Sequence, residues 1–315
     1  MSFCEGDKMS SGSSNSTGGY WVSKYTYDPM PLEIAIFASV ISGILGFIGS
    51  LTNAFVMFLI SRIKADHELE NMDIYILSLC LSDFLSSTVA QPQLIPRILK
   101  RTYITKTQSV LLHITIHVTL TSGCLSLFMV TIDKYLSIKF PFSYAIYATK
   151  KNVLLSTAIP WTIALGLAVF ILLDGETETF VYPVLASVTF ISTIFLQIMI
   201  FIIARAQKRS MQRQVEAVEH NDVDSGTRRR DNRFKANKTI VLMSAVYVST
   251  WLPSIIYRLL YVAGKISFTF YIQWIHIFNI ILQLHSCINP YIYVLRTKRI
   301  QTVFRRFYGT VEDIS

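Results

Sequence analysis

Seven long apolar stretches follow one another along the chain, and polar connectors separate them. They span residues 34–60, 74–95, 107–132, 153–173, 179–204, 239–257 and 266–295. A helix needs about 20 mainly apolar residues to cross a bilayer. Each stretch is close to that length or longer. The pattern therefore predicts an all-α protein built as a bundle of seven transmembrane helices.

The polar segments divide the chain into three parts. Residues 1–31 are rich in Ser and Gly and predict a disordered tail, and residues 32–295 form the membrane domain. Residues 205–238 are expected to be its third cytoplasmic loop. In the last part, residues 296–315, apolar positions 300, 303, 304 and 307 alternate with basic ones. This spacing predicts a short amphipathic helix that contacts membrane lipids on the inner leaflet.

Composition and charge support this assignment and orient it. The chain is 52% hydrophobic and 16% charged, whereas soluble proteins have about 25% charged residues. Most Lys and Arg residues lie after the first, third, fifth and seventh stretches, so these segments are expected in the cytoplasm and the N-terminus outside. The basic run Arg228-Arg229-Arg230 flanks a predicted membrane helix, so no nucleic-acid partner is expected. The sequon at Asn15 then predicts a plasma-membrane glycoprotein.

Asp83 is the one residue with a formal charge inside the seven stretches, with His counted as neutral. A carboxylate at mid-membrane costs about 2.5–3.5 kcal/mol, so it is expected to face the bundle interior with polar partners. Asn53 and Asn289 are the predicted partners. These residues support two interpretations equally. The first is a cation or proton site that responds to conformation, with sodium as the candidate metal. The second is a protonated Asp83 that is hydrogen-bonded within a polar core.

Two prolines are expected to bend the last two helices. Pro253 leaves the carbonyl of Ser249 without its helical donor, and Pro290 does the same to Ser286. Trp251 lies two residues before the first bend. Such kinks provide hinges for a switching bundle, although spanning helices also tolerate proline without a function. Similarly, Asp133 and Lys134 at the end of the third helix could form a lock or simple interfacial anchors.

Together these features resemble the rhodopsin-like family of G protein-coupled receptors. Asn53, the segment ending in Asp83, Asp133-Lys134-Tyr135, the Tyr247/Trp251/Pro253 set and Asn289-Pro290-x-x-Tyr293 match its motifs in order across seven helices. The resemblance implies a sodium site at Asn53, Asp83 and Asn289. It also implies that the following residues serve activation and G protein coupling: Asp133, Lys134, Tyr135, Pro141, Tyr247, Trp251, Pro253, Asn289, Pro290 and Tyr293.

The resemblance further implies a receptor mechanism and no enzymatic activity. An extracellular agonist favours a state in which the sixth helix swings outward, and a heterotrimeric G protein enters the opened cleft. Arrestin is a further expected partner. The seventh stretch contains no lysine that could hold retinal. No cofactor is therefore expected beyond the candidate sodium ion.

Two departures from the family pattern leave an alternative open. Lys134 stands where the family has arginine, and lysine lacks the planar fork for bidentate contacts. Gln197 stands where a tyrosine usually helps to stabilise the active state. A non-signalling decoy or partner receptor is therefore the second hypothesis. The short second outer connector is similar to that of melanocortin receptors, which places the chain loosely near the melanocortin, adenosine, cannabinoid and lysophospholipid group.

A ligand pocket is expected near the outer ends of the helices. Its candidate residues are His113, Ile116, His117, Thr121, Trp251, Arg258, His276, Asn279 and Gln283. Ile116 stands where aminergic receptors carry an aspartate, so an amine is not favoured. Arg258 either contacts an acidic ligand group or snorkels to the interface. A small molecule, a lipid with a head group or a peptide fits this set.

Overall fold

The computed structural model describes residues 30–66, 68–100, 106–173, 178–217 and 224–312, and the described residues contain helices without strands. Asn15 and most of the 1–31 tail lie outside these ranges. In chain order the elements are α1 (Leu32–Asp66), α2 (Asn71–Leu85), the π-helix η1 (Ser86–Ala90), α3 (Gln91–Lys100), α4 (Lys106–Lys139), α5 (Pro141–Tyr147), α6 (Lys150–Leu173), α7 (Glu178–Ala217), α8 (Asp224–Val262), α9 (Phe268–Arg296) and α10 (Lys298–Glu312).

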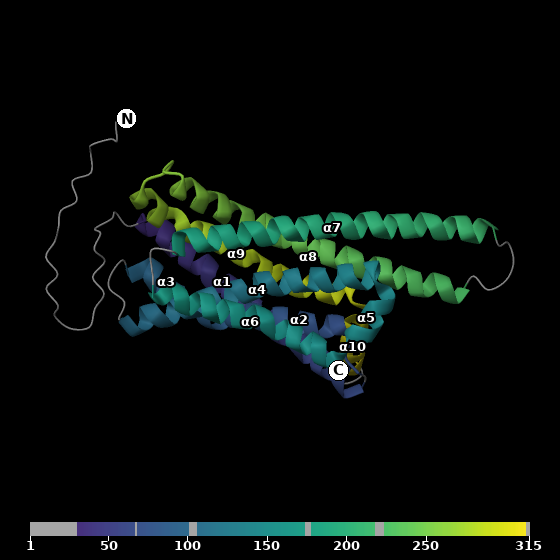
Figure 1. Cartoon of the computed structure of the whole chain (residues 1–315). Coiled ribbons are helices and arrows are strands. Elements are labelled where there is room, and N and C mark those ends of the chain that lie inside the picture. The colour runs from purple at the N-terminus through teal and green to yellow at the C-terminus, as the bar shows by residue number, and fades with distance from the viewer. Residues whose placement is uncertain (1–29, 67, 101–105, 174–177, 218–223, 313–315) are drawn as a thin grey trace, which may run out of the picture.

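The long helices pack side by side as a seven-helix bundle, in which α2, η1 and α3 form one continuous rod (Figure 1). Large apolar side chains cover the outside, for example Phe37, Phe47 and Ile191, each exposed by about two thirds. Polar side chains such as Asn53 and Asp83 are buried instead. This inside-out distribution is the one that a lipid solvent favours, because lipid leaves polar groups unsatisfied.

Six of the seven helices are long and apolar enough to cross a membrane by composition among the described residues, and α9 is the exception. The reason lies in its inner face, where Gln283, His285, Ser286 and Asn289 are all buried. These polar residues lower the average hydropathy of α9 although its outer face is apolar. The predicted seventh helix is therefore present, and it contributes several polar side chains to the interior of the bundle.

The second predicted helix contains a π-helical turn that its hydrophobic pattern did not indicate. The backbone N–H of Gln91 donates to the carbonyl of Ser86, five residues back. Pro92 explains the wide turn, because its ring crowds the carbonyl of Thr88 and offers that carbonyl no N–H. The turn leads directly into Gln91, which is buried and lines the pocket described below.

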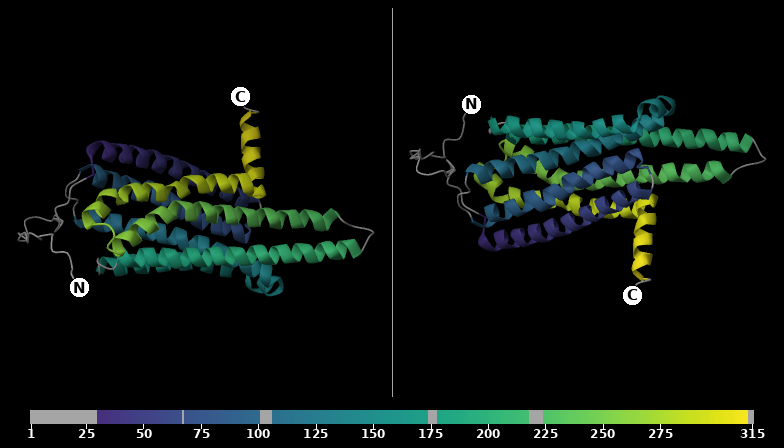
Figure 2. Two further views of the ribbon diagram at one scale, coloured as in Figure 1. Left: turned by 90° about the horizontal axis from the view of Figure 1, so that it is seen from above. Right: turned by 90° about the horizontal axis from the view of Figure 1, so that it is seen from below.

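The expected third loop, residues 205–238, is mostly helical. α7 continues to Ala217 and α8 begins at Asp224, and the two extensions project together beyond the bundle (Figure 2). The polar composition of this segment predicts a loop. However, the residues up to Ala217 are mainly Ala, Arg, Lys, Gln and Glu, which are strong helix formers in water. The inner ends of α7 and α8 therefore lie well past the bundle.

The predicted amphipathic helix is α10, which runs across the bundle axis (Figure 2). Ile300 is fully buried, and Phe304 packs edge-on against Phe55 of α1 with ring centroids 6.0 Å apart. Arg299 Nη1 bonds Asp73 Oδ2 of α2 at 2.8 Å. The apolar face of α10 thus fixes it to α1, and the ion pairs of Arg299 with Asp73 and Glu70 fix it to the start of α2.

Candidate functional site

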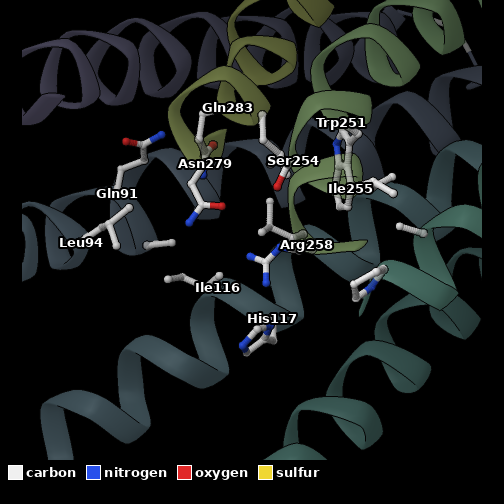
Figure 3. A pocket seen from close by; sticks show the side chains of 15 residues that line it. Gln91, Leu94, Ile116, His117, Trp251, Ser254, Ile255, Arg258, Asn279 and Gln283 are labelled. Carbon is white, nitrogen blue, oxygen red and sulfur yellow. The ribbon is translucent and has the colours of Figure 1, made fainter. Parts of the chain in front are cut away.

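A cleft opens between the helices near the end of the bundle at which α1 begins (Figure 3). Its empty volume is about 690 Å³, the open mouth included. Residues of η1, α3, α4, α7, α8 and α9 line it: Ala90, Gln91, Leu94, Ile116, His117, Leu120, Pro183, Ala186, Trp251, Ser254, Ile255, Arg258, Asn279, Leu282 and Gln283. The lining is mainly apolar with a few polar groups, as is usual for ligand sites.

The cleft contains six of the predicted pocket residues: Ile116, His117, Trp251, Arg258, Asn279 and Gln283. Thr121 is buried outside the lining, and His276 is also outside it. The side chain of His113 lies outside the described residues. Sequence reasoning missed Gln91 and Ser254. Ser254 could have been found, because it is four residues before Arg258 and so on the same helical face.

Arg258 is the one permanently charged residue among the described residues that line the cleft. It is half-buried, and its Nη1 donates to the hydroxyl of Tyr271 on α9 at 3.1 Å. No carboxylate among the described residues pairs with it. Figure 3 shows its guanidinium directed into the same space as the amide of Asn279. A partly buried guanidinium with only a neutral partner retains donors for an anion.

Trp251 lies at the base of the cleft and links it to the core below. Its ring meets Phe190 edge-on at 5.6 Å and stacks near Tyr247 at 6.0 Å. Its indole nitrogen and the hydroxyl of Ser254 are buried without a hydrogen-bond partner among the described residues. Both groups belong to the lining of the cleft, so a ligand could supply the missing partners.

A polar cluster surrounds Asp83 beneath this base. Oδ1 accepts from Ser286 Oγ at 3.0 Å, and Oδ2 accepts from Asn289 Nδ2 at 3.1 Å. The structure therefore brings Asp83 and Asn289 together, as predicted. It adds His285, whose Nε2 lies 3.4 Å from Oδ1. Sequence reasoning missed this residue, although a histidine four positions before Asn289 must share its helical face.

Asn53 is placed differently from the prediction. Its Nδ2 donates to the carbonyl of Gly49 in its own helix and to the carbonyl of Ser286 in α9, both at 2.9 Å. The second carbonyl is the one that Pro290 deprives of its helical donor. Asn53 therefore repairs the bend of α9 instead of contacting Asp83.

The residues around Asp83 do not fit a sodium ion as they are arranged. A hard cation needs a shell of oxygen ligands. Each carboxylate oxygen of Asp83 already accepts one protein donor, which leaves fewer lone pairs for a cation. The imidazole nitrogen of His285 occupies a further position beside Oδ1. Among the described residues, no group of three His, Cys, Asp or Glu could hold a metal.

The opposite end of the bundle carries the Asp133 motif. Both oxygens of Asp133 lie near the hydroxyl of Tyr144 in α5, at 2.9 and 3.1 Å. Asn71 Nδ2 of α2 contacts the same hydroxyl at 3.0 Å. Burial and the neighbouring Asp133 raise the pKa of Tyr144, so the hydroxyl stays protonated and donates to the carboxylate. α5 thus holds the acid of the motif.

The remaining predicted coupling residues lie around this end or in the core above it. Lys139 Nζ donates to Tyr135 at 2.6 Å, and Pro141 begins α5. The hydroxyls of Tyr247 and Tyr293 and the side-chain nitrogen of Gln197 are buried without a hydrogen-bond partner among the described residues. A rearrangement of α8 or α9 could give such groups new partners.

Comparison with known proteins assigns the family. The model of the 7 transmembrane receptor (rhodopsin family) matches residues 52–293. Galanin receptor 2b of Danio rerio is 22% identical, over 94% of this chain and 81% of its own length. Cannabinoid receptor 1 of Xenopus laevis is 29% identical, over 57% of this chain and 43% of its own length. With the bundle and its motifs in order, these matches show that the chain belongs to the rhodopsin family of seven-transmembrane, G protein-coupled receptors.

Proposed function

We propose that this receptor responds to an extracellular ligand with an acidic group and that Arg258 contacts this group in the cleft. The observation that carries the proposal is the state of Arg258: half-buried, in a mainly apolar lining and paired only with the Tyr271 hydroxyl. Snorkelling alone would direct the guanidinium to the interface, whereas here it points into the cleft (Figure 3). A small organic acid, an acidic lipid or a peptide carboxylate provides this chemistry.

The bonding of α8 supports a route from this ligand to a G protein. Toward the cleft, Tyr257 Oη donates to the carbonyl of Phe270 at 2.7 Å, and Arg258 bonds Tyr271. Between Val241 and Pro253, no described side chain of α8 hydrogen-bonds another helix. A ligand that draws Arg258 and Trp251 can therefore tilt α8 about Pro253, and its inner half swings outward to admit the G protein.

The ligand proposal is tested with G protein dissociation sensors in cells that express the full chain. Matched pairs of compounds, each a carboxylate and its methyl ester, are screened on wild type, Arg258→Gln and Arg258→Lys. We expect acids to activate wild type while their esters do not, with a loss of at least tenfold in potency for Arg258→Gln and partial retention for Arg258→Lys. Activators whose potency is the same on wild type and Arg258→Gln would contradict the proposal.

The same sensors test coupling. We propose that Lys134 reduces coupling to a heterotrimeric G protein without abolishing it, so Lys134→Arg should raise the signal of the wild type. Lys139→Arg is the matched control, because this lysine contacts only Tyr135 and the ring of Phe140. An equal signal for Lys134→Arg and an empty vector, with every G protein class and with an activating acid, would support the decoy alternative. Arrestin recruitment to the same face is expected to follow activation.

We also propose that the receptor resides in the plasma membrane with its N-terminus outside. The distribution of basic residues and the sequon at Asn15 support this orientation. Glycosidase treatment should shift the mobility of wild type but not of Asn15→Gln. Antibody labelling of an N-terminal tag on intact cells provides the second measurement. A tag that is reached only after permeabilisation would contradict the orientation.

A further inference from the structure

His285 is a buried ionisable residue beside Asp83, and its two ring nitrogens have different partners. His285 is only 2% exposed. Nδ1 lies against the backbone carbonyl of Leu282 in its own helix. Nε2 faces Oδ1 of Asp83 at 3.4 Å and Oγ of Ser286 at the same distance.

These partners define where the protons of the ring lie. A carbonyl only accepts, so Nδ1 must carry a hydrogen. Nε2 is therefore the ring atom that faces the carboxylate, at a position where a hard cation would need an oxygen ligand.

Aromatic side chains of α8 pack against the imidazole. The ring of Tyr247 on α8 lies over the imidazole with centroids 4.2 Å apart, and Trp251 follows at 6.2 Å. The Tyr247 hydroxyl reaches α4 where Gly123 leaves room, since a Cβ there would lie 2.7 Å from that oxygen. Ser82 Oγ would lie 3.1 Å from the same Cβ. These groups lie beside the pair, where α2, α4 and α8 meet.

We infer that the Asp83 site of this receptor excludes sodium, because the imidazole of His285 stands beside the carboxylate where the ion would need an oxygen ligand. The other ionisable groups around the pair are the thiols of Cys80 on α2, Cys124 on α4 and Cys287 on α9, with the phenols of Tyr247 and Tyr293. α1 contributes the uncharged Asn53, whose amide bonds the carbonyls of Gly49 and Ser286.

The inference connects the core to the moving helix. Tyr247 and Trp251 both belong to α8, and both rings lie beside the imidazole. An outward swing of the inner half of α8 would remove Tyr247 from His285, whereas the Asp83–His285 pair stays within α2 and α9. The inactive arrangement is therefore stabilised by packing against the imidazole rather than by a bound metal ion. This conclusion does not depend on the ligand proposed above.

The first test is the thermal midpoint of the full-length receptor in lipid nanodiscs, in NaCl and in choline chloride at equal ionic strength. We expect the wild type to give the same midpoint in both salts at every concentration. His285→Asn removes the imidazole and leaves Asp83 charged beside an amide oxygen, so this variant should gain a saturable stabilisation of a few degrees in NaCl alone. His285→Gln is measured in the same way should His285→Asn fail to fold.

Two outcomes would overturn the inference. A wild-type midpoint that rises saturably with NaCl over choline chloride would show that sodium binds despite His285. Variants that fold but remain as insensitive to sodium as the wild type would show that the imidazole is not what excludes the ion. Either result leaves the ligand proposal intact, because that proposal is measured through Arg258 in a different assay.

A double-mutant cycle tests whether Asp83 and His285 interact. Asp83→Asn and His285→Gln each remove one member of the pair, and the third variant carries both changes. If the two side chains interact, the double variant should lose much less stability than the two single losses together, because each single change already breaks the interaction. Additive losses would show that the two side chains are merely neighbours. Thr52→Ala provides the matched control, since its hydroxyl bonds only its own helix.

Discussion

Pro253 in α8 and Pro290 in α9 each free one backbone carbonyl, but among the described residues only the freed carbonyl of α9 receives a donor from another helix. In α9, Pro290 frees the carbonyl of Ser286, and Asn53 of α1 donates to it at 2.9 Å. In α8, Pro253 frees the carbonyl of Ser249, and no described side chain of another helix donates to it. The hydroxyl of Ser249 bonds back to Ala245 in its own helix.

The difference separates a fixed bend from a hinge. α9 is joined to α1 through Asn53 and to α2 through Asn289 and Ser286, which both donate to Asp83. Among the described side chains, the hydrogen bonds that join α8 to α9 lie on the pocket side of its proline, through Tyr257 and Arg258. A proline therefore does not make a hinge by itself. It does so where neighbouring helices leave one side of the bend without cross-links.

The largest effect is expected from breaking the anchor of the fixed bend. Asn53→Ala leaves the buried carbonyl of Ser286 without its donor, which costs about 1–3 kcal/mol. The thermal midpoint of the receptor should fall accordingly. Ser50→Ala is the control, because its hydroxyl bonds only Gly46 of the same helix at 2.6 Å. If both variants lose the same stability, the contact between α1 and α9 is not an anchor.

The hinge is tested by removing its cause. Pro253→Ala restores a helical N–H for the carbonyl of Ser249 and stiffens α8. We expect the ligand-driven G protein signal to fall several-fold while the thermal midpoint stays equal or rises. Pro160→Ala in α6 is the matched control and should leave the signal unchanged. A loss of signal that is equal in both variants would place the hinge elsewhere.

Hydrophobic pattern predicted the bundle well, because lipid demands long apolar helices and leaves a strong periodic record. The charge of Asp83 within an apolar stretch also indicated that its side chain faces the bundle interior, and Asp83 is buried. It did not reveal the partner of each group: Asn53 was assigned to Asp83, yet it bonds Ser286. A side-chain amide can serve any acceptor within reach, and the register between α1 and α9 decides which one. Sequence spacing within a single helix contains no information on that register.

There is a second physical reason why the sequence did not reveal some of the site residues. His285 was overlooked because a histidine in a membrane helix shows no formal charge, so its role appears only when Asp83 is seen beside it. Gln91 was overlooked because the π-turn before it changes the face that the following residues present. By contrast, the predicted residues Trp251, Arg258, Asn279 and Gln283 do line the cleft.

The smallest effect is expected from cutting one cross-link on the pocket side of the hinge. Tyr257→Phe removes the hydroxyl that bonds the carbonyls of Phe270 and Tyr271 at 2.7 and 3.3 Å. One net hydrogen bond is worth about 0.5–1.5 kcal/mol, so the thermal midpoint should fall slightly.

Tyr261→Phe is the control for this change, because its ring stacks on Tyr271 at 4.3 Å while its hydroxyl makes no hydrogen bond among the described residues. The informative result is the signal. If the pocket side of α8 must be held to α9 for its inner half to swing outward, Tyr257→Phe should lower the maximal ligand-driven response and Tyr261→Phe should not. A full response in both variants would mean that packing alone holds the pocket side, and the contrast between the two sides of Pro253 would then not explain activation.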